Sequence, residues 1–370
     1  MLTPPPRLRG PVLTCLLAAA LALSLVASVG VSADARSGAT ARTSAKHVLN
    51  DGPWPPFTAY WDPVWKAYQD ATGTQKDLMA KIALRPRVQW VTAQTQNGRT
   101  AATVRKRIEQ FQVGDPNAYA QLAVFGLYPN SEYHRSDPIS AAYQAKYRSW
   151  INQIAQGIGS SKVILILEPD LGVAWSGWHP NVRFHLAAYA AKVLGALPHT
   201  VVYMDAGDSD WLQPAKAVLM LRRSGVSHVD GIALGATHYT STSADIRYGA
   251  DLIHRLAAAG IPNKTMVIDT ADNARPFTFA WARKRMPKDE IGNANPCLTL
   301  TQTHCVTLGI PPTTDVASTR WGLSASDRAL AAQYVDAYLW FGRPWMYKQA
   351  SPFQLKRALD AARTTPYPMS

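Results

Sequence analysis

Seven short runs of apolar and β-branched residues recur along this chain, and amphipathic stretches separate most of them. Alternating strand and helix signals of this kind predict a mainly parallel sheet with helices packed on it. The expected strands are residues 88–91, 122–125, 163–167, 201–204, 231–234, 266–268 and 338–341. The expected helices are residues 101–112, 139–158, 182–197, 243–259 and 324–337. A hydrophobic content of 47% is sufficient for a large core.

Polar residues directly follow several of the expected strands. Asp170 ends a Glu-Pro-Asp segment after the third strand, Asp205 and Asp208 follow the fourth, and His238 and Asn273 follow the fifth and sixth. A parallel barrel brings such residues together at one end, and a flat doubly wound sheet would place them along one edge. The sequence therefore predicts a polar site there. No glycine-rich phosphate loop follows the first strand, which argues against a nucleotide cofactor.

The first 33 residues have the pattern of a secretory signal peptide, with two arginines, an apolar run and small residues at 31–33. A membrane anchor is the alternative, since the apolar run approaches spanning length. The small residues favour cleavage, so we expect a secreted protein without stable membrane insertion. Residues 34–50 are rich in Ser, Ala and Thr and are expected to form a flexible lead-in to one domain over residues 51–370.

Cys297 and Cys305 are the two cysteines that follow the signal segment, and in an oxidising compartment they are expected to pair. A metal site is the alternative, but neither cysteine lies in a CxxC motif and only His304 is near. We therefore expect no metal. The net charge is +13, yet Lys and Arg are scattered without a basic stripe carrying interleaved aromatics, so no nucleic-acid partner is expected. The charge is interpreted as favouring solubility and attraction to the cell envelope.

Five segments resemble, in order, motifs of glycoside hydrolase family 6, which contains cellobiohydrolases and endoglucanases. They are residues 163–170 ending in Glu-Pro-Asp, 202–207 reading Val-Tyr-Met-Asp-Ala-Gly, 231–239, 267–273, and the cysteine segment 295–314. The resemblance implies a distorted TIM-like β/α barrel of roughly seven parallel strands. It also implies a monomeric, inverting hydrolase that cleaves β-1,4-glucosidic bonds of cellulose or a related β-glucan and uses no metal or organic cofactor.

The same resemblance implies that Asp170 is the general acid and that Asp205 is its charged partner. Inverting hydrolysis needs a protonated carboxyl for the leaving oxygen, so the pKa of Asp170 must be raised by burial or by a neighbouring carboxylate. The alternative for Asp170 is a helix N-cap, and the alternative for Asp205 and Asp269 is to accept hydrogen bonds from loop amides. Glu132 is the nearest carboxylate to the place where the family has an Asp supporting the acid.

The chain departs from the family after the last expected strand, where the family has a Pro-Gly-Glu-Ser-Asp-Gly loop whose Asp is the proposed base. Lys348 falls near that position here, and a protonated amine cannot accept the proton of water. We expect Lys348 to bind a substrate hydroxyl or to pair with a carboxylate such as Asp205. Water would then be activated through a relay to Asp208, Asp210 or Glu132.

Aromatic residues are numerous, and the chain contains 12 Trp. Flat indole rings can stack on sugars, although Trp is also an ordinary core residue. The expected substrate-binding residues are Trp90, Trp211, His238, Asn273, Trp340 and Lys348, with the two residues Trp90 and Trp211 as the main platforms.

Two other classes of function were weighed. A non-catalytic carbohydrate-binding or cell-wall protein could keep the barrel and lose the base. An esterase or deacetylase would need a Gly-x-Ser-x-Gly motif or a His/Asp metal cluster, and the sequence contains neither.

Overall fold

The computed structural model describes residues 49, 51–95, 97–127, 139–177, 179–288 and 290–369. The expected signal segment and almost all of the expected lead-in therefore lie outside the described residues, and so does Glu132.

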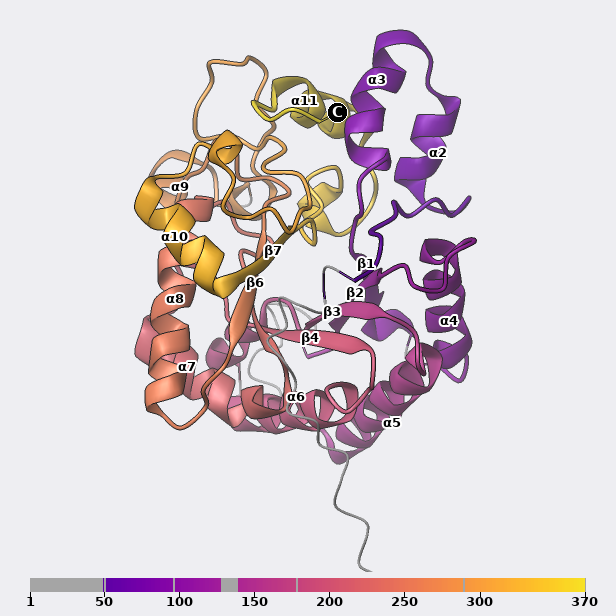
Figure 1. Ribbon diagram of the computed structural model, residues 1–370, viewed down its shortest axis with the longest axis vertical. Coiled ribbons are helices and arrows are strands. Elements are labelled where there is room, and N and C mark those ends of the chain that lie inside the picture. Colours follow the sequence, from indigo (N-terminus) through magenta and orange to yellow (C-terminus); the bar gives the residue numbers. More distant parts are fainter. Residues whose placement is uncertain are drawn as a thin grey trace, which may run out of the picture. The chain divides into compact units, whose positions relative to one another are not determined.

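Seven parallel strands form a single sheet whose spatial order follows the chain, from β1 to β7 (Figure 1). They are β1 Gln89–Thr92, β2 Ala120–Phe125, β3 Val163–Leu167, β4 Thr200–Asp205, β5 Gly231–Leu234, β6 Thr265–Asp269 and β7 Val335–Leu339. Each strand pairs in parallel with the next one along the chain. Parallel strands covered on both faces are expected to be continuously apolar, as the Val-Ile-Leu-Ile-Leu sequence of β3 is.

The sheet curls until its first and last strands approach each other. The backbone N–H of Val88 donates to the carbonyl of Trp340 at 2.9 Å, and the indole N–H of Trp90 donates to the carbonyl of Phe341 at 2.9 Å. We call this place the β7–β1 seam. The sequence-based prediction of a distorted β/α barrel with seven parallel strands is thus confirmed.

Alternate side chains of the strands enter two different cores. Residues such as Ile164, Ile166 and Val267 point inward and form a cluster inside the curled sheet. Their neighbours, such as Leu165 and Ile268, point outward and pack against the helices in the largest cluster. Each fully buried aliphatic side chain of this kind contributes about 1.5–3 kcal/mol, so both layers stabilise the barrel.

Helices surround the outer face of the sheet, and α4 to α8 pack each against the next (Figure 1). The helices are α2 Pro63–Asp70, α3 Gly73–Ala83, α4 Thr100–Phe111, α5 Ala141–Ile158, α6 Pro180–Leu194, α7 Pro214–Arg223, α8 Thr242–Ala258, α9 Phe279–Arg285, α10 Ala325–Tyr334 and α11 Leu355–Thr364. Serine hydroxyls cap three of them: Ser140 accepts from Tyr143 N, Ser241 from Ala244 N, and Ser324 from Asp327 N. Within the described ranges, none of these helices combines the length and apolar character needed to cross a membrane.

The last strand starts earlier than the sequence predicts. β7 begins at Val335, whereas residues 324–337 were expected to be helical and the strand was expected at 338–341. A register shift between Met266 and Val267 in β6 leaves Asp336 opposite no partner in the ladder. This irregularity interrupts the alternation that marks a strand in sequence, so the prediction was wrong there.

The expected disulfide is present, and it joins Cys297 to Cys305. It closes a loop between α9 and the segment that leads to α10.

Candidate active site

The chain leaves β3 through a strained turn. Glu168 and Asp170 both have positive φ angles, 53° and 63°, which are uncommon for residues other than glycine. The buried Glu168 carboxylate holds this turn by accepting from Gly126 N at 2.9 Å, Leu127 N at 2.8 Å and Tyr147 OH at 2.7 Å. Burial raises the pKa of Glu168 to about 7, although these donors oppose the rise. The turn fixes the direction of the Asp170 side chain.

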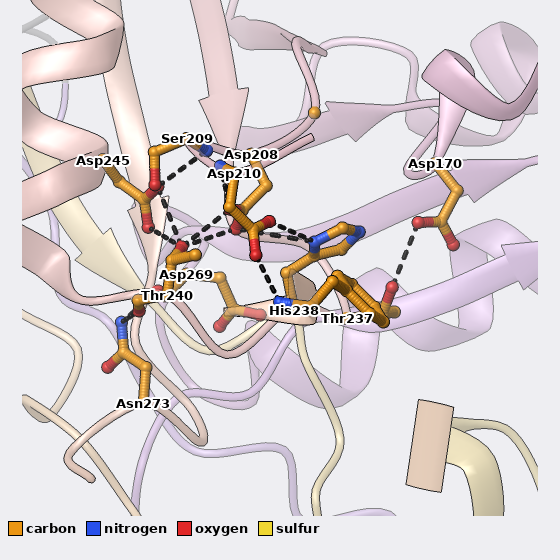
Figure 2. Close-up of polar contacts among 12 residues, drawn as sticks. Asp170, Asp208, Ser209, Asp210, Thr237, His238, Thr240, Asp245, Asp269 and Asn273 are labelled. Atoms are coloured by element: carbon orange, nitrogen blue, oxygen red, sulfur yellow. Dashed lines mark hydrogen bonds and ion pairs between the residues drawn. The ribbon is translucent and has the colours of Figure 1, made fainter. Parts of the chain in front are cut away.

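Asp170 lies at the C-terminal end of β3 and is partly exposed. Its Oδ1 accepts a hydrogen bond from the Thr237 hydroxyl at 3.0 Å (Figure 2). Burial raises the pKa of Asp170, and the positive charge of His238, the Thr237 hydrogen bond and Arg343 oppose that rise. The net effect favours the protonated carboxyl, which is the state that a proton donor needs.

Asp205 ends β4 and is fully buried. Its Oδ2 accepts from Gly207 N at 3.1 Å. Burial and the neighbouring charge of Asp170 raise the pKa of Asp205 well above its ordinary value. Two carboxyls that interact in a buried place cannot both ionise readily, so this pair retains protons.

His238 carries a positive charge into the same region. Its ring stacks on Trp211, with centroids 5.0 Å apart, and meets the edge of Phe279 at 4.4 Å. Nδ1 lies 3.5 Å from Asp210 Oδ1 and 3.9 Å from Asp208 Oδ2 (Figure 2). Burial lowers the pKa of His238, but the surrounding carboxylates outweigh it and raise the pKa to about 9. The ring is therefore an imidazolium at neutral pH.

A hydroxyl group lies between two buried carboxyls. Thr240 Oγ1 lies 2.8 Å from both oxygens of Asp208 and 3.1 Å from both oxygens of Asp245. A hydroxyl has one hydrogen to donate, so it cannot satisfy two carboxylate anions. Burial and the charge of Asp208 raise the pKa of Asp245 well above its ordinary value, so the pair retains a proton. Burial raises the pKa of Asp208 to about 6 against the charge of His238.

Asp208, Asp210 and His238 are also a group that could hold a metal ion. One potential ligand atom from each lies within 4.8 Å of the others. Without a metal, the His238 imidazolium is the cation that faces these two carboxylates, and a metal ion would have to displace its proton.

Asp269, the last residue of β6, and Asn273, which follows it, hold the neighbouring backbone in place. Asp269 accepts from Ala271 N at 3.0 Å, from Phe341 N at 3.2 Å and from Gly342 N. A side chain at residue 342 would collide with the Asp269 carboxylate, so this contact requires glycine. Asn273 is buried, and its amide donates to Thr240 O at 3.1 Å and Thr242 Oγ1 at 3.2 Å. Asp269 therefore makes the contacts of its alternative role, in which it accepts hydrogen bonds from loop amides.

The three tryptophans expected to bind substrate have different surroundings. Trp340 is fully buried, and its indole donates to Ile310 O at 2.9 Å, so the structure offers no ring face to a sugar there. Trp211 is partly exposed, and one of its faces is covered by His238. Trp90 is 8% exposed, and the Arg343 guanidinium lies 4.1 Å above its ring. Direct stacking of sugar on Trp90 would require Arg343 to move.

Lys348 lies on the surface in a short 3-10 helix, Tyr347–Gln349, and its backbone N–H donates to Asn293 Oδ1 at 2.9 Å. Its Nζ lies 5.6 Å from the centre of the Tyr347 ring. The expected pairing with Asp205 is not formed, because Asp205 is buried and Lys348 is exposed.

Several residues of this region were not identified from the sequence, among them Thr237, Thr240, Asp245, Arg343 and Gln349. Gln349 is buried, accepts from Arg343 N at 2.7 Å and donates to Asp272 Oδ2 at 2.9 Å. It thereby fixes the loop after β7 to the loop after β6. Thr237 follows β5 and Arg343 follows β7, and this position after a strand is the sequence feature from which they could have been predicted.

The family model for glycosyl hydrolases family 6 matches residues 56–344. Endoglucanase A of Cellulomonas fimi is 32% identical over 244 residues, which are 63% of this chain and 50% of that protein. Endoglucanase A of Thermobispora bispora is 30% identical over 189 residues, which are 49% of this chain and 41% of that protein. The chain thus spans about half the length of the curated relatives it matches.

Solved structures agree with this match. The endoglucanase Cel6 of Mycobacterium tuberculosis, solved with methyl-cellobiosyl-4-deoxy-4-thio-β-D-cellobioside, aligns with a TM-score of 0.65 at 25% identity and covers 84% of this chain and 97% of its own. The catalytic domain of Cellulomonas fimi Cel6B aligns with a TM-score of 0.56 at 17% identity over 86% of this chain and 92% of its own, which supports the fold alone. The profile match over most of the chain, together with the seven-stranded curled sheet, establishes that this chain belongs to glycosyl hydrolases family 6.

Proposed function

We propose that the protein hydrolyses β-1,4-glucosidic bonds of cellulose or a related β-glucan with inversion at the anomeric carbon. Family membership supports this, as do the endoglucanase relatives. The Mycobacterium tuberculosis neighbour was solved with a cellobiosyl oligosaccharide, which supports a glucan as the ligand. The apolar segment within residues 1–33 supports export, with residues 51–370 as the catalytic domain.

Asp170 is the proposed general acid, and the observation that carries this assignment is its surroundings. The carboxyl is partly exposed at the C-terminal end of β3, so a substrate oxygen can reach it. It accepts the Thr237 hydrogen bond, and burial raises its pKa. The protonated neighbour Asp205 adds no negative charge beside the departing sugar. A positioned acid of this kind accelerates cleavage by about 10²–10⁴-fold.

The proposed route for the proton of the attacking water ends at Asp210. Asp205 retains its own proton, and Asp269 is occupied by backbone N–H groups. Although burial raises the pKa of Asp210, its hydrogen bonds and His238 outweigh this effect and lower it, so the carboxylate is ionised. A carboxylate with a lowered pKa is a weak base, so we expect slow turnover.

Asp170→Asn tests the function directly. We expect the release of reducing sugar from soluble and amorphous β-glucans to fall by about a hundredfold or more, because the amide has no proton to give. Asp70→Asn is the matched control, since Asp70 is 63% exposed on α2. NMR of the first product should show the α-anomer. Unchanged activity in Asp170→Asn, or a β-anomer as the first product, contradicts the proposal.

The second candidate is a non-catalytic glucan-binding protein. The presence of Lys348, where the family has its proposed base, is the observation that favours it. Measurable binding of cello-oligosaccharides by the wild-type protein, without sugar release from any β-glucan, would select this candidate.

A further inference from the structure

Arg343, in the loop after β7, carries a guanidinium whose charge acts on the proposed acid Asp170. Its carbon lies 4.1 Å from the centre of the Trp90 ring, at the β7–β1 seam. The backbone N–H of Arg343 is held by Gln349 at 2.7 Å, and the Trp90 indole is held by Phe341 O at 2.9 Å. The main chain of Arg343 and the indole of Trp90 are therefore each anchored, and the guanidinium lies over the indole ring.

One donor of this guanidinium is buried and unused by the protein. Arg343 Nε is buried and has no hydrogen-bond partner in the described part of the chain, whereas the residue as a whole is partly exposed. An arginine carries five N–H donors in a planar fork, and leaving a buried one unpaired is costly. A ligand oxygen could accept from this donor.

The charge of Arg343 is also left without a compensating anion in the active protein. Burial lowers the pKa of Arg343 to about 10, and Asp170 is the carboxylate whose charge opposes that effect. The general acid must be protonated to act, and a protonated Asp170 cannot balance the guanidinium. Arg343 still carries its proton at neutral pH, so its positive charge is then available to pair with another anion.

Because the guanidinium covers Trp90, a sugar at this position meets a charged fork rather than an indole face. Planar guanidinium groups bind carboxylates through two parallel hydrogen bonds. We propose that Arg343 selects a carboxylated β-1,4-glycan, one that carries glucuronate residues, by pairing with a sugar carboxylate beside Trp90. This inference rests on the proposed function and names its substrate class. The net charge of +13 would attract such an acidic polymer over longer range.

Binding of disaccharides to the wild-type protein tests the inference without relying on hydrolysis. Isothermal titration calorimetry would compare cellobiose with two analogues in which glucuronate replaces one glucose residue, at either end. We expect at least one analogue to bind about tenfold more tightly than cellobiose, since a charge-assisted pair is worth that much. In Arg343→Met the preference should disappear, and in Arg343→Lys part of it should remain.

Arg320→Met is the matched control. Arg320 also stacks on a tryptophan, with its guanidinium carbon 4.2 Å from the Trp321 ring, and Trp321 packs outside the sheet. The Arg320→Met variant therefore loses one charge and one Arg–Trp stack, as Arg343→Met does. Its preference for a glucuronate analogue over cellobiose should nevertheless persist. Thermal unfolding would confirm that each variant is folded.

Equal binding of cellobiose and both analogues by the wild type overturns the inference, and so does a preference that survives in Arg343→Met. Neither result affects the proposed function, which depends on sugar release from neutral β-glucans. Conversely, absence of sugar release defeats the proposed function while the calorimetric comparison still decides whether Arg343 binds a carboxylate.

Discussion

At the scale of single residues, the Asp170 carboxyl is controlled by neighbours that come from separate strands. Thr237 follows β5, Arg343 follows β7, and His238 lies beside Thr237. All three favour the ionised carboxylate, while burial favours the protonated one and prevails. The pH range of activity is thus adjustable through the neighbours of the acid.

Removing the Thr237 hydroxyl should move that range. The hydrogen bond stabilises the charged form of Asp170, so its loss in Thr237→Ala raises the pKa of Asp170 further. Activity needs the protonated acid and is lost as pH rises through this pKa. The alkaline limb of the kcat/KM profile is therefore expected at higher pH. Thr237→Ser keeps the hydroxyl and should leave the limb in place; a shift toward lower pH in the alanine variant contradicts this account.

Gln349 should be important for stability. Its link to the proposed ligand site is the hydrogen bond that it accepts from Arg343 N. Gln349→Ala removes two hydrogen bonds and leaves Arg343 N and the buried Asp272 carboxyl without them. We expect the free energy of unfolding to fall by about 1–3 kcal/mol. Urea unfolding would measure the change. The exposed Gln302 is the control, and Gln302→Ala should cost less than about 0.5 kcal/mol.

Asp170 and Asp205 could be proposed from the sequence, because they lie at the ends of strands that carry family motifs. It could not place Trp340 correctly, since an indole at a strand end reads the same whether it is buried or open. The Arg343–Trp90 stack joins residues from the two ends of the sheet, and such a contact exists only once the sheet has curled. The sequence therefore could not predict this stack, because it depends on the closure of the sheet.

At the scale of elements, the seven strands and the helices α4, α5, α6, α8 and α10 were predicted, whereas α2, α3, α7, α9 and α11 were not. The five apolar residues of β3 were predicted with the correct bounds. α9 was not predicted, because it has seven residues and buries only Ala282, so it has no periodic apolar face. β7 was misplaced because the irregularity at Asp336 disturbs its alternation.

The disulfide should stabilise one loop rather than the whole barrel. Beside it, Cys297 N donates to Val306 O at 2.9 Å and Val306 N donates to Asn295 O at 3.0 Å. In the Cys297→Ser/Cys305→Ser double variant we expect the free energy needed to open this loop to fall by about 2 kcal/mol, since the closed loop is short. Amide exchange should increase over residues 295–306 and not in the strands. Reducing agent should reproduce this effect in the wild type and leave the double variant unchanged.

At the scale of the whole molecule, buried acids outnumber the cations that could compensate them near the C-terminal ends of the strands. The buried acids there are Glu168, Asp205, Asp208, Asp245, Asp269 and Asp272. Burial raises the pKa of every one of them. The folded protein therefore binds more protons than the unfolded chain over a wide pH range.

Stability should fall as pH rises from mildly acidic to alkaline values. The pKa values of Glu168 and Asp269 are about 7, against about 4 in an unfolded chain, so their contribution is complete below pH 4 and is lost as pH rises through 7. His238, at about 9 against about 6.5 when unfolded, extends the loss to pH 9. Urea midpoints at pH 5, 7 and 9 should decrease in that order. A midpoint that rises between pH 5 and 7 excludes this charge balance.

The β7–β1 seam is the place where the strands of the barrel should separate most easily. All other neighbouring strands are joined by ladder pairs, with a register shift between β6 and β7, whereas here Val88 N and the Trp90 indole supply the two bonds described above. Thermal separation of the strands therefore costs least at this edge. Trp90 lies on one side of this edge and Arg343 on the other, so a separation of the strands here would part their stack. The β7–β1 seam, where the strands separate most easily, is therefore also the place where a sugar would meet Trp90 and Arg343.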